Sequence, residues 1–406
     1  MRARRGTGTT EPGDATRRLA LATLAFTIAE ASILALSGYT GAVVADLELS
    51  SAQTGALTAT LTVTFGLVQV PTGLLARRVG TRATLVVGLL LFAAGALGSA
   101  TTPSYGRMVI TQAVTGAGAG MIVPSASAVA MHPDPLINTR RQGVVGSGWG
   151  IGYLLGLLVI PWLVPSWRAA LGALAVAAAL TGLTALALLR TSPRVLAGGA
   201  AGTELRLGRG VWSLALIMAG IAMANVGASA WAPAILGEAG ASRGEALLAA
   251  SMIGWGILLG ALGGPVTVAR GYGVPGVATV AAILMTTSLL VLAAEPGALG
   301  SLAALFTIGV ATGIVFPVLL GSVPVVAGTT HPSGQALVAG IVNGTGMLGA
   351  SAGPPVVGLV ADATGAVAPG VAALCVGPAV SCLFALGVLR GAQHPRARET
   401  SATQGG

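Results

Sequence analysis

The sequence has no lysine, only two cysteines and very few charged or aromatic residues. Charged residues make up 8% of the 406 positions and aromatic residues 4%, whereas soluble domains carry roughly 25% charged residues. Hydrophobic residues make up 54%, glycine occurs 62 times, and the mean hydropathy is +0.86. This composition excludes an ordinary soluble domain and indicates a membrane protein.

The two cysteines are too far apart for a disulfide if they share a helix. Cys375 and Cys382 are seven positions apart in one apolar stretch, which corresponds to about 10.5 Å of helical rise. A disulfide needs Cα atoms closer than about 7 Å. The cysteines therefore say nothing about the redox compartment.

Motifs of soluble catalysis are also missing. The sequence has no phosphate-binding loop, no nucleophile elbow and no paired metal ligands. His132, His331 and His394 are scattered and predict no metal site. We therefore expect no enzymatic activity, no cofactor and no ATP-driven pump within this chain.

Long apolar stretches predict twelve membrane-spanning helices, each of the roughly 20 residues that a bilayer requires. They do not alternate between apolar and polar residues, which disfavours a membrane β-barrel. The two spans at 298–326 and 333–361 contain proline and glycine, so we expect them to be kinked. The remaining expected spans are 19–44, 51–75, 83–102, 106–131, 142–165, 168–190, 211–236, 244–269, 274–294 and 367–390.

Arginine placement predicts the orientation. If the N-terminus is cytoplasmic, 18 arginines fall in inner segments and only Arg107, Arg168 and Arg243 fall outside. By the positive-inside rule, both termini are then cytoplasmic. The net charge of +9 is spread over several inner segments, which favours contact with anionic lipid and disfavours a nucleic-acid-binding face. We expect a multi-pass protein of the cell membrane.

One short phrase occurs twice. GAGAGMIVP at 116–124 and GVATGIVFP at 309–317 share glycine, glycine and proline at four-residue spacing, 193 positions apart. Similarly, 143–156 aligns with 340–353 at an offset of 197. One such pair could arise by chance, but several pairs in the same order favour an internal repeat. Glycines at this spacing let helices pack closely and the proline bends the helix. The expected contact positions are Gly116, Gly120, Pro124, Gly152, Gly156, Gly309, Gly313, Pro317, Gly349 and Gly353.

Six spans per copy preserve the orientation, so the two copies are expected to be parallel. This predicts an all-α membrane protein with two six-helix pseudo-repeats and a solute site between them near the membrane midplane. The expected parts are a cytoplasmic tail at 1–18, a first half at 19–191, a linker at 192–210, a second half at 211–390 and a tail at 391–406.

Over about 15–392, the sequence resembles the major facilitator superfamily in its twelve-helix bacterial form. The segment GLLARRVGTR at 73–82 is similar to the family's gating-loop motif, which assigns gating roles to Gly73, Arg78, Gly80 and Arg82. Three positions depart from family motifs. Arg77 replaces an aspartate that helps latch the halves, Gln112 replaces an arginine linked to proton handling, and Tyr153 replaces the proline of antiporters.

Glu30 is the one acidic residue expected well inside a span. Ionisable side chains are costly at that depth, at about 2.5 to 3.5 kcal/mol, so they point to function by default. We interpret Glu30 as a proton carrier, the alternative being a glutamate hydrogen-bonded at a helix contact.

Other polar and aromatic side chains are candidates for the cavity wall. Interhelical hydrogen bonding is the alternative role for the amides and interfacial anchoring for the aromatic residues. Gln69, nearer the cytoplasmic end, is assigned a structural role. The candidates for the cavity are Tyr39, Gln112, Trp149, Asn225, Trp231 and Asn343.

Few charges in the spans predict a small neutral, apolar or weakly basic organic substrate. The resemblance implies a secondary transporter working by alternating access. We expect a monomer and favour proton-coupled export. One alternative is uptake of a small anion, for which Arg107 is the only candidate ligand. Another is a sensor or scaffold that binds without transport, because fold does not fix function.

Overall fold

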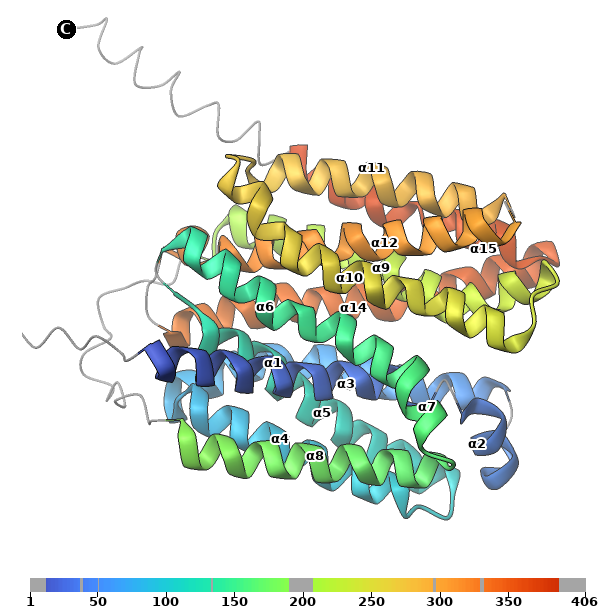
Figure 1. The fold of residues 1–406 in the computed structure, drawn as a ribbon, viewed down its shortest axis with the longest axis horizontal. Helices are drawn as coiled ribbons and strands as arrows, with labels where there is room; N and C mark the ends of the chain where they lie inside the picture. The colour runs from blue at the N-terminus through green and yellow to red at the C-terminus, as the bar shows by residue number, and fades with distance from the viewer. Residues whose placement is uncertain are drawn as a thin grey trace, which may run out of the picture.

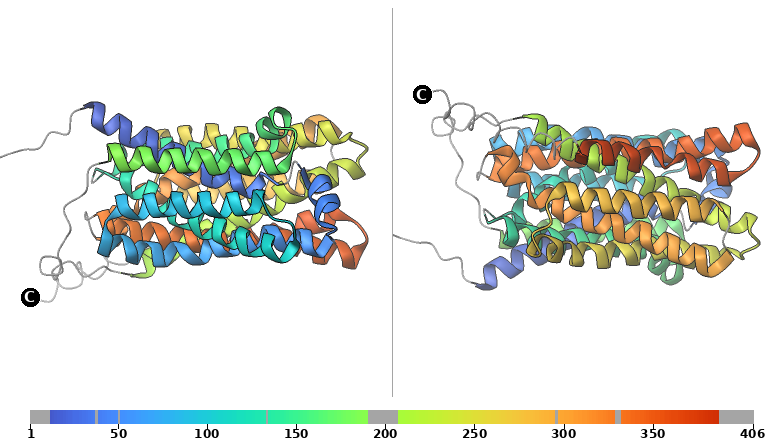
Figure 2. Two further views of the ribbon diagram at one scale, coloured as in Figure 1. Left: turned by 90° about the horizontal axis from the view of Figure 1, so that it is seen from below. Right: turned by 90° about the horizontal axis from the view of Figure 1, so that it is seen from above.

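The computed structural model describes residues 12–36, 39–49, 51–132, 134–189, 207–294, 297–328 and 332–386. Helices account for the regular structure of these residues, without a strand among them. They lie side by side along one axis (Figure 1), and the same alignment is visible from below and above (Figure 2). The N-terminal helices are α1 (Pro12–Leu34), α2 (Thr40–Leu47), α3 (Ser51–Val79), α4 (Thr81–Ala100), α5 (Tyr105–Ala130), α6 (Pro135–Leu154), η2 (Leu155–Val159), α7 (Ile160–Leu163) and α8 (Trp167–Leu188).

The remaining helices form the second half of the bundle. The predicted tail at 391–406 and most of the linker at 192–210 lie outside the described residues. The helices of this half are α9 (Arg209–Glu238), α10 (Arg243–Ala269), α11 (Val274–Ala293), α12 (Gly297–Gly321), α13 (Val323–Ala327), α14 (Pro332–Thr364) and α15 (Val367–Ala373). After a two-residue turn that follows α15, the chain is helical again over residues 376–386.

Eleven helices of the described chain are long and apolar enough to cross a membrane. The helix α1 is not among them, because it ends at Leu34 and includes Arg17, Arg18 and Glu30. The expected first span over 19–44 is therefore wrong in its bounds. It is divided between α1, which begins seven residues earlier at Pro12, and the short α2.

The expected span 142–165 is also not one regular helix. It consists of α6, the π-helical turn η2 and the short α7, which ends at Leu163. The prolines of the repeated phrase, Pro124 and Pro317, lie inside the continuous helices α5 and α12. Proline is tolerated in membrane helices because neighbouring groups satisfy the freed carbonyl.

The internal repeat is visible in the packing of α5 on α3 and of α12 on α10. A Cβ atom added to Gly116 or Gly120 would meet the carbonyl oxygens of Leu61 and Phe65 in α3. In the second half, a Cβ atom on Gly309 or Gly313 would meet the carbonyls of Ile253 and Ile257 in α10. Both members of each contact recur 192 or 193 positions later. The two copies therefore share helix contacts as well as sequence similarity.

A second pair of contacts repeats in the same way. Gly152 of α6 and Gly156 of η2 lie against the backbone of α1 at Thr27 and Ala31. Their counterparts in α14 lie against α9, where a Cβ atom on Gly349 would meet Ala219 and one on Gly353 would meet Met223. Glycine at these positions lets two helix backbones approach closely.

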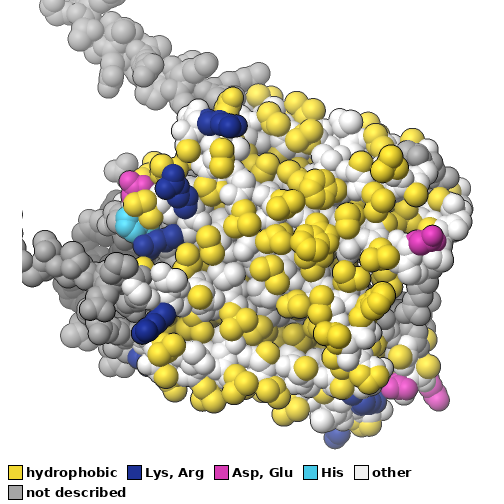
Figure 3. All heavy atoms as spheres, viewed as in Figure 1, with side chains coloured by type: hydrophobic (Ala, Val, Ile, Leu, Met, Phe, Trp, Pro, Cys, Tyr) yellow, Lys and Arg dark blue, Asp and Glu magenta, His cyan; other side chains and the backbone are white. Residues whose placement is uncertain are grey.

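We call the end of the bundle where α1 starts the inner end; the arginine distribution predicts that it is cytoplasmic. Figure 3 shows most visible arginine side chains at this end and hydrophobic side chains over the middle of the molecule. That middle belt includes exposed Leu90, Val176, Leu180 and Ile283. Such a surface suits contact with lipid chains rather than water.

The two halves meet along α3 with α14 and along α6 with α10 and α12. On α3, a Cβ atom at Gly73 would lie 2.5 Å from the Cα atom of Leu337 in α14. On α6, a Cβ atom at Gly143 would lie 2.6 Å from the carbonyl oxygen of Ala261 in α10. These residues lie toward the inner end of their helices, so the halves are closely packed there.

Candidate functional site

A small cavity lies between the two halves, at the middle of the bundle. Its volume is about 20 Å³, which is room for about one water molecule. Both halves contribute to its wall. The lining residues are Phe26, Glu30, Phe65, Gln69, Val123, Trp149, Met218, Ala222, Phe316, Asn343, Gly346, Met347 and Ala350.

Four side chains of this wall have buried polar atoms without a hydrogen-bond partner among the described residues. These atoms are Oε2 of Glu30, both amide atoms of Gln69, Nε1 of Trp149 and Nδ2 of Asn343. All four residues are at most 4% exposed, and buried polar groups are nearly always hydrogen-bonded. Their unused donors and acceptors can therefore bind a polar or charged group that enters the cavity.

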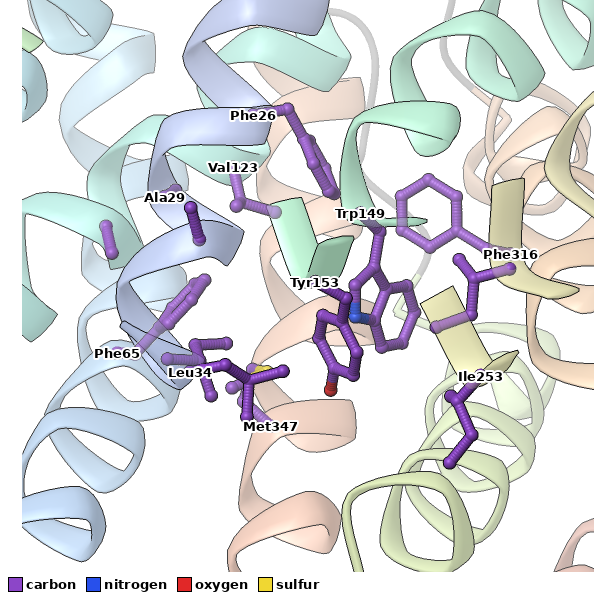
Figure 4. Packing of buried hydrophobic residues seen from close by; sticks show 14 of the residues in the cluster. Phe26, Ala29, Leu34, Phe65, Val123, Trp149, Tyr153, Ile253, Phe316 and Met347 are labelled. Carbon is purple, nitrogen blue, oxygen red and sulfur yellow. The ribbon is translucent and has the colours of Figure 1, made fainter. Parts of the chain in front are cut away.

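Much of the apolar part of the wall is aromatic. Phe316 of α12 contacts both Phe26 and Trp149 edge to face, with ring centroids 5.5 Å and 5.9 Å apart. These contacts join α1 and α6 of the first half to α12 of the second (Figure 4). Phe65 of α3 supplies a fourth ring of the lining. Aromatic faces favour apolar groups and cations.

Glu30 is positioned by the close approach of α1 and α6. A Cβ atom on Gly152 would lie 2.8 Å from the Cβ atom of Glu30 and 2.8 Å from the backbone nitrogen of Ala31. A larger residue at Gly152 would push α1 away at the point where the carboxyl group enters the cavity. Glu30 is the one ionisable side chain in the lining, which contains no arginine or histidine.

The predicted cavity residues divide into two groups. Glu30, Trp149 and Asn343 are lining residues, whereas Tyr39, Gln112, Asn225 and Trp231 are not. Glu30 and Trp149 come from the first half and Asn343 from the second. The structure thus brings together three side chains that are far apart in sequence.

Tyr39 and Trp231, which are 192 positions apart, both hold neighbouring helices together. The Tyr39 hydroxyl donates to the carbonyls of Ile160 and Val164, at 3.0 Å and 2.7 Å. Nε1 of Trp231 donates to the carbonyl of Pro354 in α14, at 3.0 Å. With their polar atoms directed to backbone carbonyls, both side chains lie outside the cavity wall.

The two amides outside the wall are buried in helix contacts. Gln112 in α5 is 2% exposed, and its Oε1 atom has no hydrogen-bond partner within the described part of the chain. Asn225 in α9 accepts a hydrogen bond from the Tyr153 hydroxyl of α6, at 3.4 Å. This bond crosses between the halves about one helical turn from the lining residues Trp149 and Ala222.

The predicted gating loop has structural roles in this conformation. Gly80 has φ +90°, a value that favours glycine, and joins α3 to α4. Arg82 donates to the carbonyl of Leu186 in α8, and Arg78 is exposed. Gly73 lies within α3 and forms part of the close contact with α14.

Sequence reasoning placed Gln69 outside the cavity and did not identify the phenylalanines. A comparison of the two copies of the repeat could have identified the polar residues of the cavity. At the offset of 192, Glu30 corresponds to Ala222 and Gln69 to Ala261, and at 197 Asn343 corresponds to Gly146. Each polar side chain of the cavity is thus matched by alanine or glycine in the other copy.

Among the described residues, no group of three or more His, Cys, Asp or Glu side chains could hold a metal ion. Both cysteines are free. The arrangement is that of a membrane transport protein, with two packed helical halves and a central polar and aromatic cavity between them.

Residues 19–354 match the family model of the Major Facilitator Superfamily, so the chain belongs to that superfamily. It is a membrane transporter by family and not an enzyme. Comparison with curated protein sequences gives no match.

Solved structures of the same fold cover nearly the whole chain. One is the human organic anion transporter MFSD10 (TETRAN), with a TM-score of 0.77 and 16% identity over 91% of this chain and 99% of that one. The E. coli fucose:proton symporter FucP has a TM-score of 0.67 and 17% identity over 91% and 98%. FucP in the outward conformation gives 0.66 and 17% over 92% and 98%. At this identity the likeness establishes the fold alone.

Proposed function

We propose that this protein is a proton-coupled secondary transporter that exports a small neutral, apolar or weakly basic organic solute by alternating access. The observation that carries the proposal is Glu30, the sole ionisable side chain of a cavity built by both halves. Rocking of the halves around such a midplane site is how transporters with this kind of repeat alternate access.

Proton coupling follows from the surroundings of the carboxyl group. A carboxyl group taken out of water favours its neutral form when no cation compensates it, and the lining offers Glu30 none. When one side of the cavity opens, water reaches the group and favours release of the proton. A cationic solute that binds the carboxylate would exchange with the proton at the same place.

The substrate class follows from the rest of the wall. Four aromatic rings favour a flat apolar or cationic group, and the amides of Gln69 and Asn343 can bind one or two polar atoms. The cavity of about 20 Å³ holds no organic molecule, so the halves must separate before the solute enters. We favour export because solutes of this type enter a cell through lipid without a transporter. Only active outward transport then keeps the solute concentration inside the cell below that outside.

The orientation and location remain part of this proposal. The arginine distribution supports cytoplasmic termini, a cytoplasmic linker at 192–210 and residence in the cell membrane. We propose that the transporter works as a monomer, because a single chain supplies both halves of the cavity.

The alternative is uptake of a small anion, and the name of MFSD10 as an organic anion transporter gives it some weight. An anion site needs a cation, however, and the candidate Arg107 is exposed at the start of α5 and is not a lining residue. The lining offers no cation to hold an anion, and Glu30 in its ionised form would repel one. The cavity therefore favours a neutral or basic solute.

A thermal-stability screen of the purified protein tests the substrate class, because a ligand that binds the folded state raises its apparent stability. Tetraphenylphosphonium represents aromatic organic cations and benzoate represents organic anions. We expect stabilisation by the cation, loss of this stabilisation in Glu30→Gln, and no loss in Glu238→Gln, whose carboxyl group is exposed outside the cavity. Stabilisation by benzoate alone would overturn the proposed class in favour of the alternative.

A further inference from the structure

Asn138 lies in the first helical turn of α6, at the inner end, where the two halves meet. The helix starts at Pro135, and Asp134 caps it by accepting a hydrogen bond from the backbone nitrogen of Ile137 at 2.9 Å. The Asn138 side chain is fully buried. A carboxamide in such a place must be explained by its hydrogen bonds.

The amide of Asn138 joins the two halves. Its Nδ2 atom donates to the carbonyl oxygens of Leu320 and Gly321 in α12, at 3.3 Å each. Its Oδ1 atom accepts from the backbone nitrogen of His132, at 3.1 Å. The last carbonyls of a helix have no partner within that helix. A side chain of the first half therefore caps the C-terminus of a helix of the second half.

The neighbouring residue makes the contact tight. A Cβ atom on Gly321 would meet the side chain of Thr139, so glycine is needed for α12 to reach α6 here. Opening the inner end would separate these helices and break both hydrogen bonds to α12. The carbonyls of Leu320 and Gly321 and the amide of Asn138 would then need hydrogen bonds to water instead.

We propose that Asn138 is an inner latch that stabilises the conformation closed at the inner end. The hydrogen bonds of this latch must break before solute can exchange at the inner end. The latch extends the proposed function but uses no property of the solute or the coupling ion.

Gln142 provides a matched control. It lies one turn further along α6, is fully buried and donates to the carbonyl of Ser127 in α5, at 2.9 Å. The chemistry is the same, an amide bonded to a backbone carbonyl, but this bond stays within the first half. Loss of Gln142 should affect stability without releasing the latch.

A cysteine reporter at Ala261 measures opening of the inner end. Ala261 in α10 is fully buried. It lies against Gly143 and Gly146 of α6, and Gly146 lies against the cavity residue Phe316. In a background where Cys375 and Cys382 are serine, the rate of labelling of Ala261→Cys by N-ethylmaleimide in the purified protein reports how often this interface opens.

We expect Asn138→Ala to raise the labelling rate by about two- to tenfold for each hydrogen bond lost, while Gln142→Ala leaves it near the parent value. Asn138→Asp keeps the size of the side chain and the acceptor for His132 but removes the donor. It carries the same expectation if the alanine variant does not fold. A labelling rate unchanged in the Asn138 variants, or raised equally by Gln142→Ala, would overturn the latch. Because labelling needs no substrate, that result would leave the proposed substrate and coupling untouched.

Discussion

The closest helix contacts of the repeat can be tested by adding a single methyl group. A Cβ atom on Gly120 would lie 2.5 Å from the carbonyl oxygen of Phe65 and 3.2 Å from the Cβ atom of Val68. An ordinary van der Waals contact is 3.4 Å or more, so α3 and α5 would have to separate by several tenths of an ångström.

The expected size of the effect follows from two opposing terms. Overpacking of a close-packed interior costs about 1 to 3 kcal/mol. Glycine to alanine in a helix interior gains up to about 1 kcal/mol in intrinsic propensity. We therefore expect Gly120→Ala to lower the free energy of unfolding by up to about 2 kcal/mol. Leucine at the same position should prevent recovery of folded protein.

Gly172 in α8 is the control, because a Cβ atom there would meet nothing within 4 Å. Gly172→Ala should be neutral or stabilising, the opposite sign to Gly120→Ala. The assay is the midpoint of thermal unfolding of the purified protein, with folded yield as a second measure. Equal stability of the two alanine variants would refute the claim that the repeated glycines set the helix spacing.

Further predictions concern topology, packing and the cavity wall. Reporter fusions at both termini and within 192–210 should all score cytoplasmic, and an outside score for the linker would contradict six spans per half. Trp231→Phe removes the donor to a carbonyl of α14 and should cost about 0.5 to 1.5 kcal/mol; stability equal to that of Trp212→Phe, at a half-exposed position, would argue against this bond. Trp149→Ala should weaken stabilisation by tetraphenylphosphonium while Trp162→Ala, 78% exposed, should not. Equal effects would place the ligand elsewhere.

The helical fold and the repeat could be predicted because they rest on composition and spacing. Apolar length predicts the helices, and glycines that recur at one offset predict which helices pack in each half. The break after α1 was missed because 19–44 is predominantly apolar, although Ser37 and Gly38 are residues that favour turns. Helix ends depend on such local chemistry more than on hydropathy.

The cavity was predicted only in part because these helices are apolar on all sides. A helix without a polar face does not reveal which side chain points toward the centre. Tyr39 and Trp231 were therefore assigned to the wall, although their polar atoms bind carbonyls of neighbouring helices. Gln69 was assigned by depth alone, and depth does not show that this residue of α3 lines the same cavity as Asn343 of α14.

The central claim is that Glu30 couples solute movement to protons, and transport by Glu30→Gln in proteoliposomes tests it most directly. Glutamine keeps the shape and hydrogen-bonding capacity of the side chain but cannot titrate. With the cation that best stabilises the wild-type protein, we expect exchange at equal pH to persist in the variant while uphill accumulation driven by a pH gradient is abolished. Undiminished gradient-driven accumulation in Glu30→Gln would contradict the account.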